Sequence, residues 1–329
     1  MNNVTIKLGI IGTNFISDWM CENVAISSGI VNHAVYSRTW ERGEAFAKKH
    51  SIERVFTSFE DFLSSDIDAV YVASPNALHF PQAMAAIEHG LHAIVEKPAG
   101  LNEAEFSALE EAAKNHGVIF MEAMRPAHDP VMGLIRDALR GIGVIRRATL
   151  EFCQYSSRYD KYKAGVHVNT FDPRLGNAAI MDIGIYPMYC AAELFGAPSK
   201  ICASSVMLPG GMEGLGSVVM DYGTHQVEVL YSKITDSENP SVIMGEDGSL
   251  LLGKLSTLEH VGLHMRGGKY ETLIENREEN NMLYEIANFV SAVRGEFDLT
   301  HCLRTSRLTI SLIDEARRQS GITFPTELR

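Results

Sequence analysis

Glu96 and Lys97 follow the short apolar run 93–95 and precede Pro98. Because proline cannot extend a strand ladder, the chain is expected to turn there, with both charges at the carboxyl end of a predicted strand. Ligands bind at that edge of open α/β sheets, where an ammonium group could face a reacting oxygen. A surface ion pair at a strand end is the alternative interpretation, and the other elements of the chain must decide between the two.

A second pair of reactive side chains lies in the apolar segment 179–189. Asp182 and Tyr186 are four residues apart, so on the predicted helix, which ends before Gly196, they share one face. Tyr186 precedes Pro187, which biases it away from ideal helix geometry and predicts a local distortion that aims the hydroxyl. The alternative is a tyrosine half-buried in a domain interface.

The element that would hold a cofactor stands near the start of the chain. An apolar strand pattern over 6–11 is followed by Gly12 and by helical periodicity to about residue 28. A strand, a glycine turn and a helix form the phosphate-binding unit of a dinucleotide fold, although an ordinary strand–turn–helix remains the alternative. Asn14 takes the second glycine position of the usual pattern, and asparagine tolerates a positive φ better than other non-glycine residues; Ser17 takes the third. The residues expected at the cofactor here are Gly12, Thr13, Asn14, Phe15 and Ile16.

The end of the second predicted strand, 31–37, favours NADP over NAD. A typical NAD-binding protein has an acidic residue about 20 residues past the glycine turn, where it binds the ribose 2′-hydroxyl. This chain instead has Ser37, Arg38 and Thr39, with Arg42 one helical turn further on. A hydroxyl and a guanidinium group suit a 2′-phosphate. The alternative is that Arg38 caps a solvated helix start.

Strand and helix continue to alternate as far as residue 121, which predicts a doubly wound parallel sheet. The further strands are expected at 69–73, 93–97 and 118–121, and the helices at 77–89 and 102–115. Four side chains past the strand 69–73 are expected near the nicotinamide half of the cofactor, namely Ser74, Pro75, Asn76 and His79. His79 could equally be a satisfied surface histidine.

The sequence pattern changes after Arg125. Strands with hairpin signals extend from 200 to 273, which predicts an open, mostly antiparallel sheet with helices on one face. We therefore predict a Rossmann domain over 1–124 and an α+β substrate and oligomerisation domain over 125–329, whose last helix packs back on the first domain. The uncovered sheet face predicts self-association, and the family resemblance described below implies a homodimer or homotetramer. The other elements expected in this half are a strand at 144–155 and helices at 130–139, 280–293 and 302–319.

Composition excludes several classes of protein. The net charge of -12 over 329 residues argues against a nucleic-acid partner. No apolar run approaches the roughly 18 residues of a membrane span, and a strand-like run begins too early to leave room for a signal peptide. The 5 cysteines are scattered, which indicates a reduced, cytoplasmic protein. No metal site is expected, because Gly90 separates His89 from His92 and no cysteine stands at ligand spacing.

Taken together, four segments resemble the Gfo/Idh/MocA family, named for glucose–fructose oxidoreductase and inositol dehydrogenase. They are the glycine turn, 74–79 (SPNALH), 96–98 (EKP) and 182–186 (DIGIY). Many family members have histidine where this chain has Tyr186; tyrosine resembles the branch of glucose–fructose oxidoreductase, dimeric dihydrodiol dehydrogenase and NADP-dependent xylose dehydrogenase. The chain departs from the family pattern at Asn14 and at 176–178 (GNA), where a richer glycine run is expected.

The resemblance implies hydride transfer between NADP, or NAD, and a carbinol carbon of a sugar, polyol or dihydrodiol. Tyr186 would be the acid/base; a phenol has an ordinary pKa of about 10, and a nearby Lys97 ammonium would favour the phenolate. Lys97 would also bind the substrate oxygen, Asp182 would orient substrate or Lys97, and Glu96 would position the nicotinamide. The substrate walls are expected to include Arg125, which also lies near the cofactor, Tyr155, Arg158 and Phe171; His128 and His167 could reach the same space.

Two other functions remain open. A non-catalytic NADP-sensing regulator would have no reason to keep both Lys97 and Tyr186. An NAD-dependent glycoside hydrolase would hold its cofactor tightly and show no net oxidation.

Overall fold

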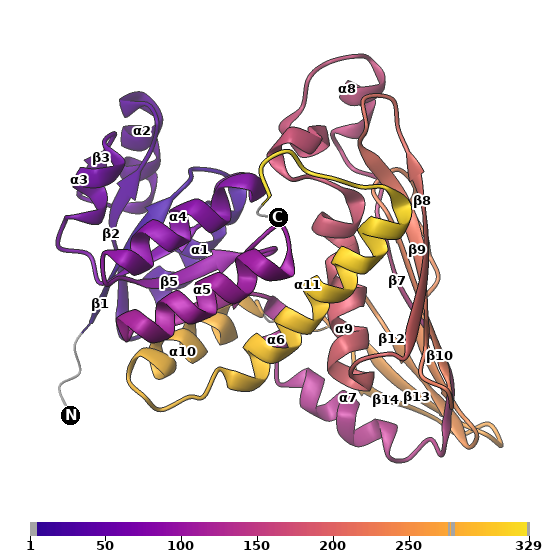
Figure 1. Cartoon of the computed structure of the whole chain (residues 1–329). Coiled ribbons are helices and arrows are strands. Elements are labelled where there is room, and N and C mark those ends of the chain that lie inside the picture. The colour runs from indigo at the N-terminus through magenta and orange to yellow at the C-terminus, as the bar shows by residue number, and fades with distance from the viewer. Residues whose placement is uncertain (1–4, 276, 278–279, 328–329) are drawn as a thin grey trace. The chain divides into compact units, whose positions relative to one another are not determined.

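Unit 1 of the computed structural model is built on a six-stranded sheet (Figure 1). The structure describes residues 5–275, 277 and 280–327, and it divides into unit 1, which holds residues 5–124 and Met282–Leu303, and unit 2, Arg125–Asn281 and Arg304–Glu327. The order β3-β2-β1-β4-β5-β6, with parallel pairing throughout, confirms the doubly wound sheet. Its strands are β1 (Ile6–Ile11), β2 (Ile30–Tyr36), β3 (Arg54–Phe56), β4 (Ala69–Val72), β5 (His92–Glu96) and β6 (Phe120–Ala123).

The helices of unit 1 begin and end at residues suited to those positions. Ser58 and Asn102 accept hydrogen bonds from the first turns of α3 and α5, and Gly117 ends α5 in the left-handed conformation, at φ 66°. These helices are α1 (Phe15–Ile26), α2 (Trp40–His50), α3 (Phe59–Leu63), α4 (His79–Glu88, preceded by the 3₁₀ turn Asn76–Leu78), α5 (Glu103–His116) and α10 (Met282–Val293).

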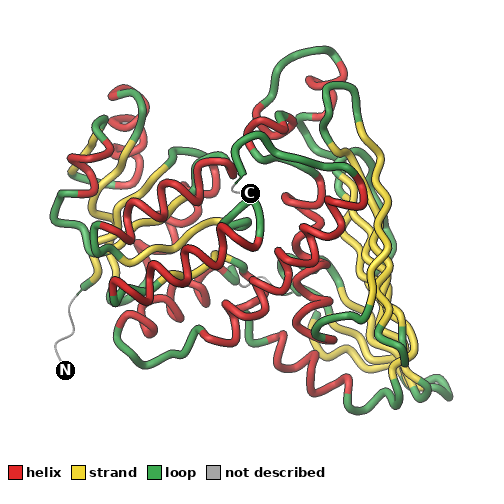
Figure 2. Tube along the Cα trace, viewed as in Figure 1, coloured by secondary structure: helices red, strands yellow, loops and turns green. Residues whose placement is uncertain are grey.

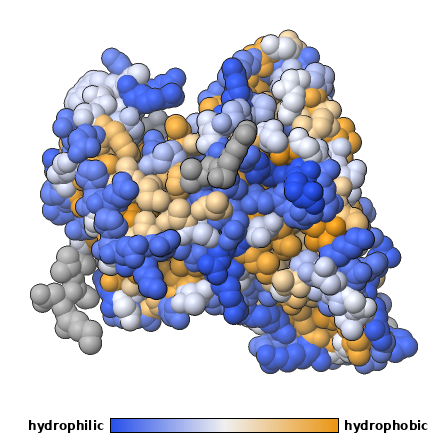
Figure 3. Space-filling model, viewed as in Figure 1, coloured by the Kyte–Doolittle hydropathy of each residue, from blue (hydrophilic) through white to orange (hydrophobic). Residues whose placement is uncertain are grey.

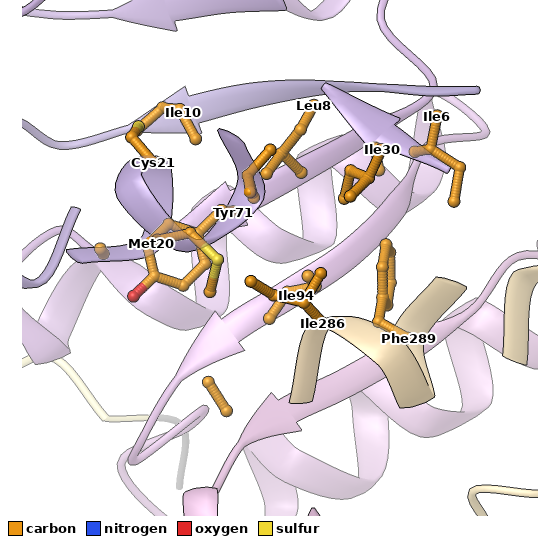
Figure 4. Close-up of a cluster of buried hydrophobic side chains, with 14 of the residues drawn as sticks. Ile6, Leu8, Ile10, Met20, Cys21, Ile30, Tyr71, Ile94, Ile286 and Phe289 are labelled. Carbon is orange, nitrogen blue, oxygen red and sulfur yellow. The ribbon is translucent and has the colours of Figure 1, made fainter. Parts of the chain in front are cut away.

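Helix α10 joins the core of unit 1 although it lies far along the chain. Ile286 and Phe289 are fully buried and belong to one apolar cluster with Ile94 of β5 (Figure 4). Burying such side chains stabilises the docking of the helix by about 1.5–3 kcal/mol each. The predicted boundary of 125–329 therefore differs from the structure at Met282–Leu303, which belongs to unit 1, whereas the packing of the last helix on the first domain stays a prediction.

Unit 2 contains an eight-stranded sheet of order β14-β13-β12-β11-β7-β10-β9-β8. Every neighbouring pair is antiparallel except β7 and β10, as predicted for a mostly antiparallel sheet. Its strands are β7 (Ile145–Cys153), β8 (Lys200–Met207), β9 (Glu213–Asp221), β10 (Gln226–Ser232), β11 (Ser241–Gly245), β12 (Gly248–Leu252), β13 (Val261–Met265) and β14 (Tyr270–Ile274).

The helices of unit 2 gather on one face of this sheet, as Figure 2 shows for the longer ones. They are α6 (Arg125–His128), α7 (Val131–Leu139), α8 (Tyr159–Lys163), α9 (Ile185–Phe195) and, from Arg304 on, α11 (Thr300–Ser320), with a π-helix at Ile180–Gly184 and 3₁₀ turns at Asn169–Phe171 and Pro173–Leu175. Along β9, Val218 and Met220 are buried while Val219 between them is exposed. The alternation identifies the helix-covered face and the uncovered face.

The segment Pro173–Phe195 corrects one expectation, because it is long and apolar enough by composition to span a membrane. However, 72% of its most apolar 18-residue stretch is buried inside the protein, so it serves as a core segment of unit 2.

On the face seen in Figure 3, hydrophobic and hydrophilic residues are interspersed.

Candidate active site

The glycine turn of unit 1 fits a dinucleotide at its first position. Gly12 has a φ of 103°, and a Cβ atom there would lie 2.7 Å from the carbonyl oxygen of Ala73. Only glycine therefore allows the turn to approach the end of β4. The turn leads into the N-terminus of α1, whose dipole favours a phosphate group.

Asn14 does not take the positive φ that its place in the pattern suggested. Its φ is −103°, and it is the N-cap of α1, where Oδ1 accepts hydrogen bonds from the amides of Ile16 and Ser17. Its Nδ2 donates to the carbonyl oxygen of Ala73 at 2.6 Å. Asn14 therefore does not use the positive φ that glycine permits, and its side chain instead connects the start of α1 to the end of β4.

The residues after β4 form a partly open polar edge. Ser74 Oγ is a buried atom without a hydrogen-bond partner in the described part of the chain, which suits a site that takes a polar ligand. The His79 ring is buried, with Nδ1 2.8 Å from the carbonyl oxygen of Pro98 and Nε2 2.7 Å from that of Ser74. Burial is the main cause that lowers the pKa of His79. In the structure, His79 therefore ties two loops together, and it is not the surface histidine considered as the alternative.

Two interactions fix the turn that presents Lys97. The Tyr71 hydroxyl donates to Glu96 Oε1 at 2.5 Å, and the amide of Ala99 donates to Glu122 Oε1 at 2.9 Å. Burial first, and then the Glu96 carboxylate, raise the pKa of Tyr71, so it is a proton donor here. No local sequence pattern indicates Tyr71 or Glu122, because each contacts the end of β5 or the turn after it from a neighbouring strand of the folded sheet.

At the end of β2, Ser37 is buried, whereas Arg38, Thr39 and Arg42 are exposed. Thr39 precedes α2 without a side-chain capping bond. Within the described residues, no side-chain hydrogen bond or ion pair holds Arg38, so its guanidinium group is available to a ligand. Capping of the helix by Arg38, the alternative interpretation, is not what the structure shows.

Tyr186 lies in unit 2, in the first turn of α9, and is 6% exposed. Arg125 Nη2 donates to its hydroxyl at 3.3 Å, and the Arg125 guanidinium carbon is 5.8 Å from the ring centroid. The ring of Phe152 packs against it, with the centroids 5.7 Å apart. Arg125 therefore meets the phenol directly, as a cation beside the proposed acid/base.

Asp182 forms an ion pair that the sequence analysis missed. Its Oδ2 atom is 2.7 Å from Nζ of Lys233, the residue immediately after β10. Lys233 lies far along the chain from Asp182 and follows an ordinary strand, so no spacing rule marks it. Lys233 reaches this position because β10, which it follows, pairs with both β7 and β9 in the sheet.

The predicted backbone distortion lies just upstream of Tyr186, in the π-helix Ile180–Gly184. The amide of Ile180 donates to Oε2 of the buried Glu213 at 2.8 Å, and a Cβ atom on Gly184 would lie 2.9 Å from the Tyr231 ring. Burial raises the pKa of Glu213, and the hydroxyl of Tyr231 donates to its carboxyl group at 2.7 Å. These contacts with β9 and β10 stabilise a widened helical turn, which places Asp182 within it.

Several of the residues expected to line the substrate site contact other side chains of the protein. Phe171 is buried, and the rings of Tyr159 and Tyr162 stack on it. The Tyr155 hydroxyl donates to Asp160 and accepts from Lys163. Of the remaining residues, Arg158 is exposed, His128 is buried in α6, and His167 pairs with Asp172.

The two histidines considered for a metal have separate partners. His89 Nε2 is 3.3 Å from a carboxylate oxygen of Glu60, whereas His92 Nδ1 accepts from the amide of Ile119. Among the described residues, no group of three or more histidine, cysteine, aspartate and glutamate side chains is placed to hold a metal ion.

The parallel sheet and the glycine turn of unit 1 are those of a dinucleotide-binding Rossmann domain. Residues 6–124 match the profile of the oxidoreductase family with an NAD-binding Rossmann fold, Gfo/Idh/MocA. Over 98% of both chains, the sequence is 41% identical to the uncharacterized oxidoreductase YgjR of Escherichia coli (strain K12). It is 38% identical to scyllo-inositol 2-dehydrogenase (NADP(+)) IolU of Bacillus subtilis (strain 168), over 98% of this chain and 99% of IolU.

The chain therefore belongs to the Gfo/Idh/MocA family. The fold is also that of the 3-ketoreductase KijD10 of Actinomadura kijaniata, solved with NADP and TDP-benzene, at a TM-score of 0.86 and 22% identity, covering 96% of this chain and 98% of KijD10. The family, the enzyme class and the Rossmann fold predicted from the sequence are confirmed. Lys97 belongs to unit 1, and Asp182 and Tyr186 belong to unit 2, so their joint action stays a prediction.

Proposed function

We propose that this protein transfers a hydride between NADP and a carbinol carbon of a sugar, polyol or dihydrodiol. The observation that carries the proposal is the buried phenol of Tyr186 with a guanidinium nitrogen of Arg125 3.3 Å from its hydroxyl. A buried phenol beside a cation, one helical turn from a carboxylate, suits the exchange of a proton with an alcohol.

In this proposal, each residue has a separate role in proton transfer, hydrogen bonding or positioning. When bound, the nicotinamide ring supplies a hydride acceptor or donor. Tyr186 removes the alcohol proton, or returns it in the reverse direction, and Lys97 donates a hydrogen bond to the same substrate oxygen. Asp182 accepts hydrogen bonds and orients the substrate, while Glu96, held by Tyr71, shapes the nicotinamide end.

NADP is preferred over NAD in this proposal because of the end of β2. The buried Ser37 and the exposed Arg38 present a hydroxyl and a guanidinium group where an NAD-binding chain has an acid. The relative IolU, 38% identical, is named for its use of NADP(+). NAD remains usable, because nothing at Gly12 or Ser74 requires the additional phosphate.

The test is reduction of NADP and of NAD, followed at 340 nm, over a panel of inositols, other polyols, aldoses and trans-dihydrodiols. IolU makes the inositols the first compounds to try, and scyllo-inositol the first of them. We expect one class to reduce NADP faster than NAD. A silent panel with tightly bound cofactor would contradict the proposal and would favour the glycoside hydrolase or the regulator.

We also propose that the protein is cytoplasmic and associates with itself through the uncovered face of the unit 2 sheet. The five cysteines are free thiols, as a reducing compartment maintains them. The uncovered face carries exposed apolar side chains, among them Val206 and Val219.

A further inference from the structure

Lys233 is a buried ammonium group that the mechanism above does not use. Its side chain is 3% exposed. Three groups of unit 2 surround its Nζ atom. They are Oδ2 of Asp182 at 2.7 Å, the carbonyl oxygen of Thr170 at 3.0 Å and the ring of Phe171, whose centroid is 4.9 Å away.

Each of these contacts suits a positive charge. Lysine is rarely buried this completely, because removing an ammonium group from water is unfavourable unless other groups replace the water. The carboxylate supplies an opposite charge, the carbonyl accepts a hydrogen bond, and the aromatic face attracts a cation. The site is therefore built around a charged lysine.

The two side chains of the Asp182–Lys233 pair differ in their exposure to solvent, whereas in a fully buried salt bridge both are enclosed. The side chain of Asp182 is 37% exposed, whereas that of Lys233 is almost fully enclosed. The ammonium group thus approaches the carboxylate from the protein side. The backbone of Lys233 is fixed as well, because its amide donates to the carbonyl oxygen of Gly214 at 2.9 Å.

We propose that Lys233 is a positioning residue that holds the Asp182 carboxylate, ionised and in one orientation, for the reaction. This inference rests on the proposed function, in which Asp182 accepts hydrogen bonds from the substrate or from Lys97. A carboxylate fixed by a rigid ammonium group loses less freedom when it binds a hydroxyl group, which is how a positioned group aids catalysis. A purely structural pair would affect stability and leave turnover unchanged.

A double-mutant cycle on turnover tests the inference. We expect Lys233→Met to lower kcat at least about tenfold, with the Kd for NADPH within about twofold of wild type, because the cofactor turn lies in unit 1. Lys233→Met added to Asp182→Asn should cost no more than about twofold further, since a residue that acts through another has no effect once that residue is removed. Lys233→Arg should restore part of the loss.

Thermal unfolding of the same variants gives a readout that does not depend on activity. Asp182→Asn leaves a buried ammonium group without its carboxylate, whereas Lys233→Met leaves a partly exposed carboxylate. We therefore expect the larger fall in Tm for Asp182→Asn. The matched control is Lys269→Met, which removes an exposed lysine paired with Glu271 and should change neither kcat nor Tm appreciably.

Two results would overturn the inference. The first is wild-type kcat in Lys233→Met despite a lowered Tm, while Tyr186→Phe is slowed; this would leave the proposed function standing. The second is a cycle in which the two losses simply multiply. Normal turnover of Tyr186→Phe would instead overturn the proposed function, and with it this inference.

Discussion

Tyr186 combines burial, a cation at its hydroxyl and a carboxylate one helical turn away. We expect Tyr186→Phe to lower kcat by about 10²-fold or more, because it removes the proton donor and keeps the ring that packs on Phe152. The Kd for NADPH should stay near wild type. Tyr222→Phe is the matched control, because its hydroxyl donates to the carbonyl oxygen of Gly196 and has no part in the proposed chemistry. Steady-state kinetics decide, and turnover of Tyr186→Phe near that of wild type would remove Tyr186 from the acid/base role.

Arg38 is the residue on which the cofactor preference depends. We expect Arg38→Ala to weaken NADPH binding about 10- to 100-fold relative to NADH binding, the scale of losing a charge-assisted hydrogen bond. Fluorescence titration with each reduced cofactor measures the two Kd values. Arg140→Ala, an exposed arginine in unit 2, controls for the lost charge. An unchanged NADPH to NADH ratio would refute the 2′-phosphate interpretation.

Individual residues were predictable from the sequence where they belong to a local pattern. Asp182 and Tyr186 stand at helical spacing, and Lys97 stands at a strand end before a proline, so the sequence marks these residues as candidates, and their roles stay predictions. Lys233 and Glu213 are not marked in this way, because Glu213 begins β9 and Lys233 directly follows β10, and only the folded sheet places them beside the 180–184 turn. Asn14 occupied the expected place but acts through its side chain.

Among the elements, the π-helix Ile180–Gly184 depends most on a close approach between backbone and ring. A Cβ atom on Gly184 would lie 2.9–3.1 Å from the ring atoms of Tyr231, whose hydroxyl is fixed by Glu213. We expect Gly184→Ala to destabilise the protein by about 1–3 kcal/mol and to lower kcat, because Asp182 lies in the turn that must shift. Denaturant unfolding and steady-state kinetics measure both effects.

Gly133→Ala in α7 is the matched control for that substitution. Its Cβ atom would meet only the end of the Arg136 side chain at 3.9 Å, and alanine favours a helix more than glycine does. We expect it to leave stability unchanged or to raise it by up to about 1 kcal/mol. Equal stability of the two alanine variants would show that Tyr231 yields easily and that the turn does not depend on Gly184.

Elements with a clear period were predictable, and short ones were not. The long strands and helices of both units appear where alternation or helical spacing indicated them. The short helices α3 and α8 and the short strand β3 were missed, because five or fewer residues carry too little periodicity. The π-helix could be anticipated only as a distortion before Pro187, since its cause lies in contacts with β9 and β10.

At the scale of the whole molecule, the uncovered face of the unit 2 sheet is the feature that predicts self-association. Helices α9 and α11 lie on the other face (Figure 1). Val206 of β8 is 49% exposed and Val219 of β9 is 37% exposed. Their strands pair in a register that places both side chains on the uncovered face. An apolar sheet face of this kind is usually covered by another copy of the chain, by two-fold symmetry.

We therefore expect the 36.3 kDa chain to sediment as a dimer or tetramer, and Val206→Glu/Val219→Glu to shift it toward the monomer. Two carboxylates facing their symmetry mates would lose water without gaining a partner, which opposes association. Ile26→Glu/Val31→Glu adds the same charge at exposed positions of unit 1 and should leave the assembly intact. Sedimentation velocity separates the outcomes. A monomeric wild-type protein would contradict self-association, and assembly that persists in the sheet variant but fails in the control would move the interface to unit 1.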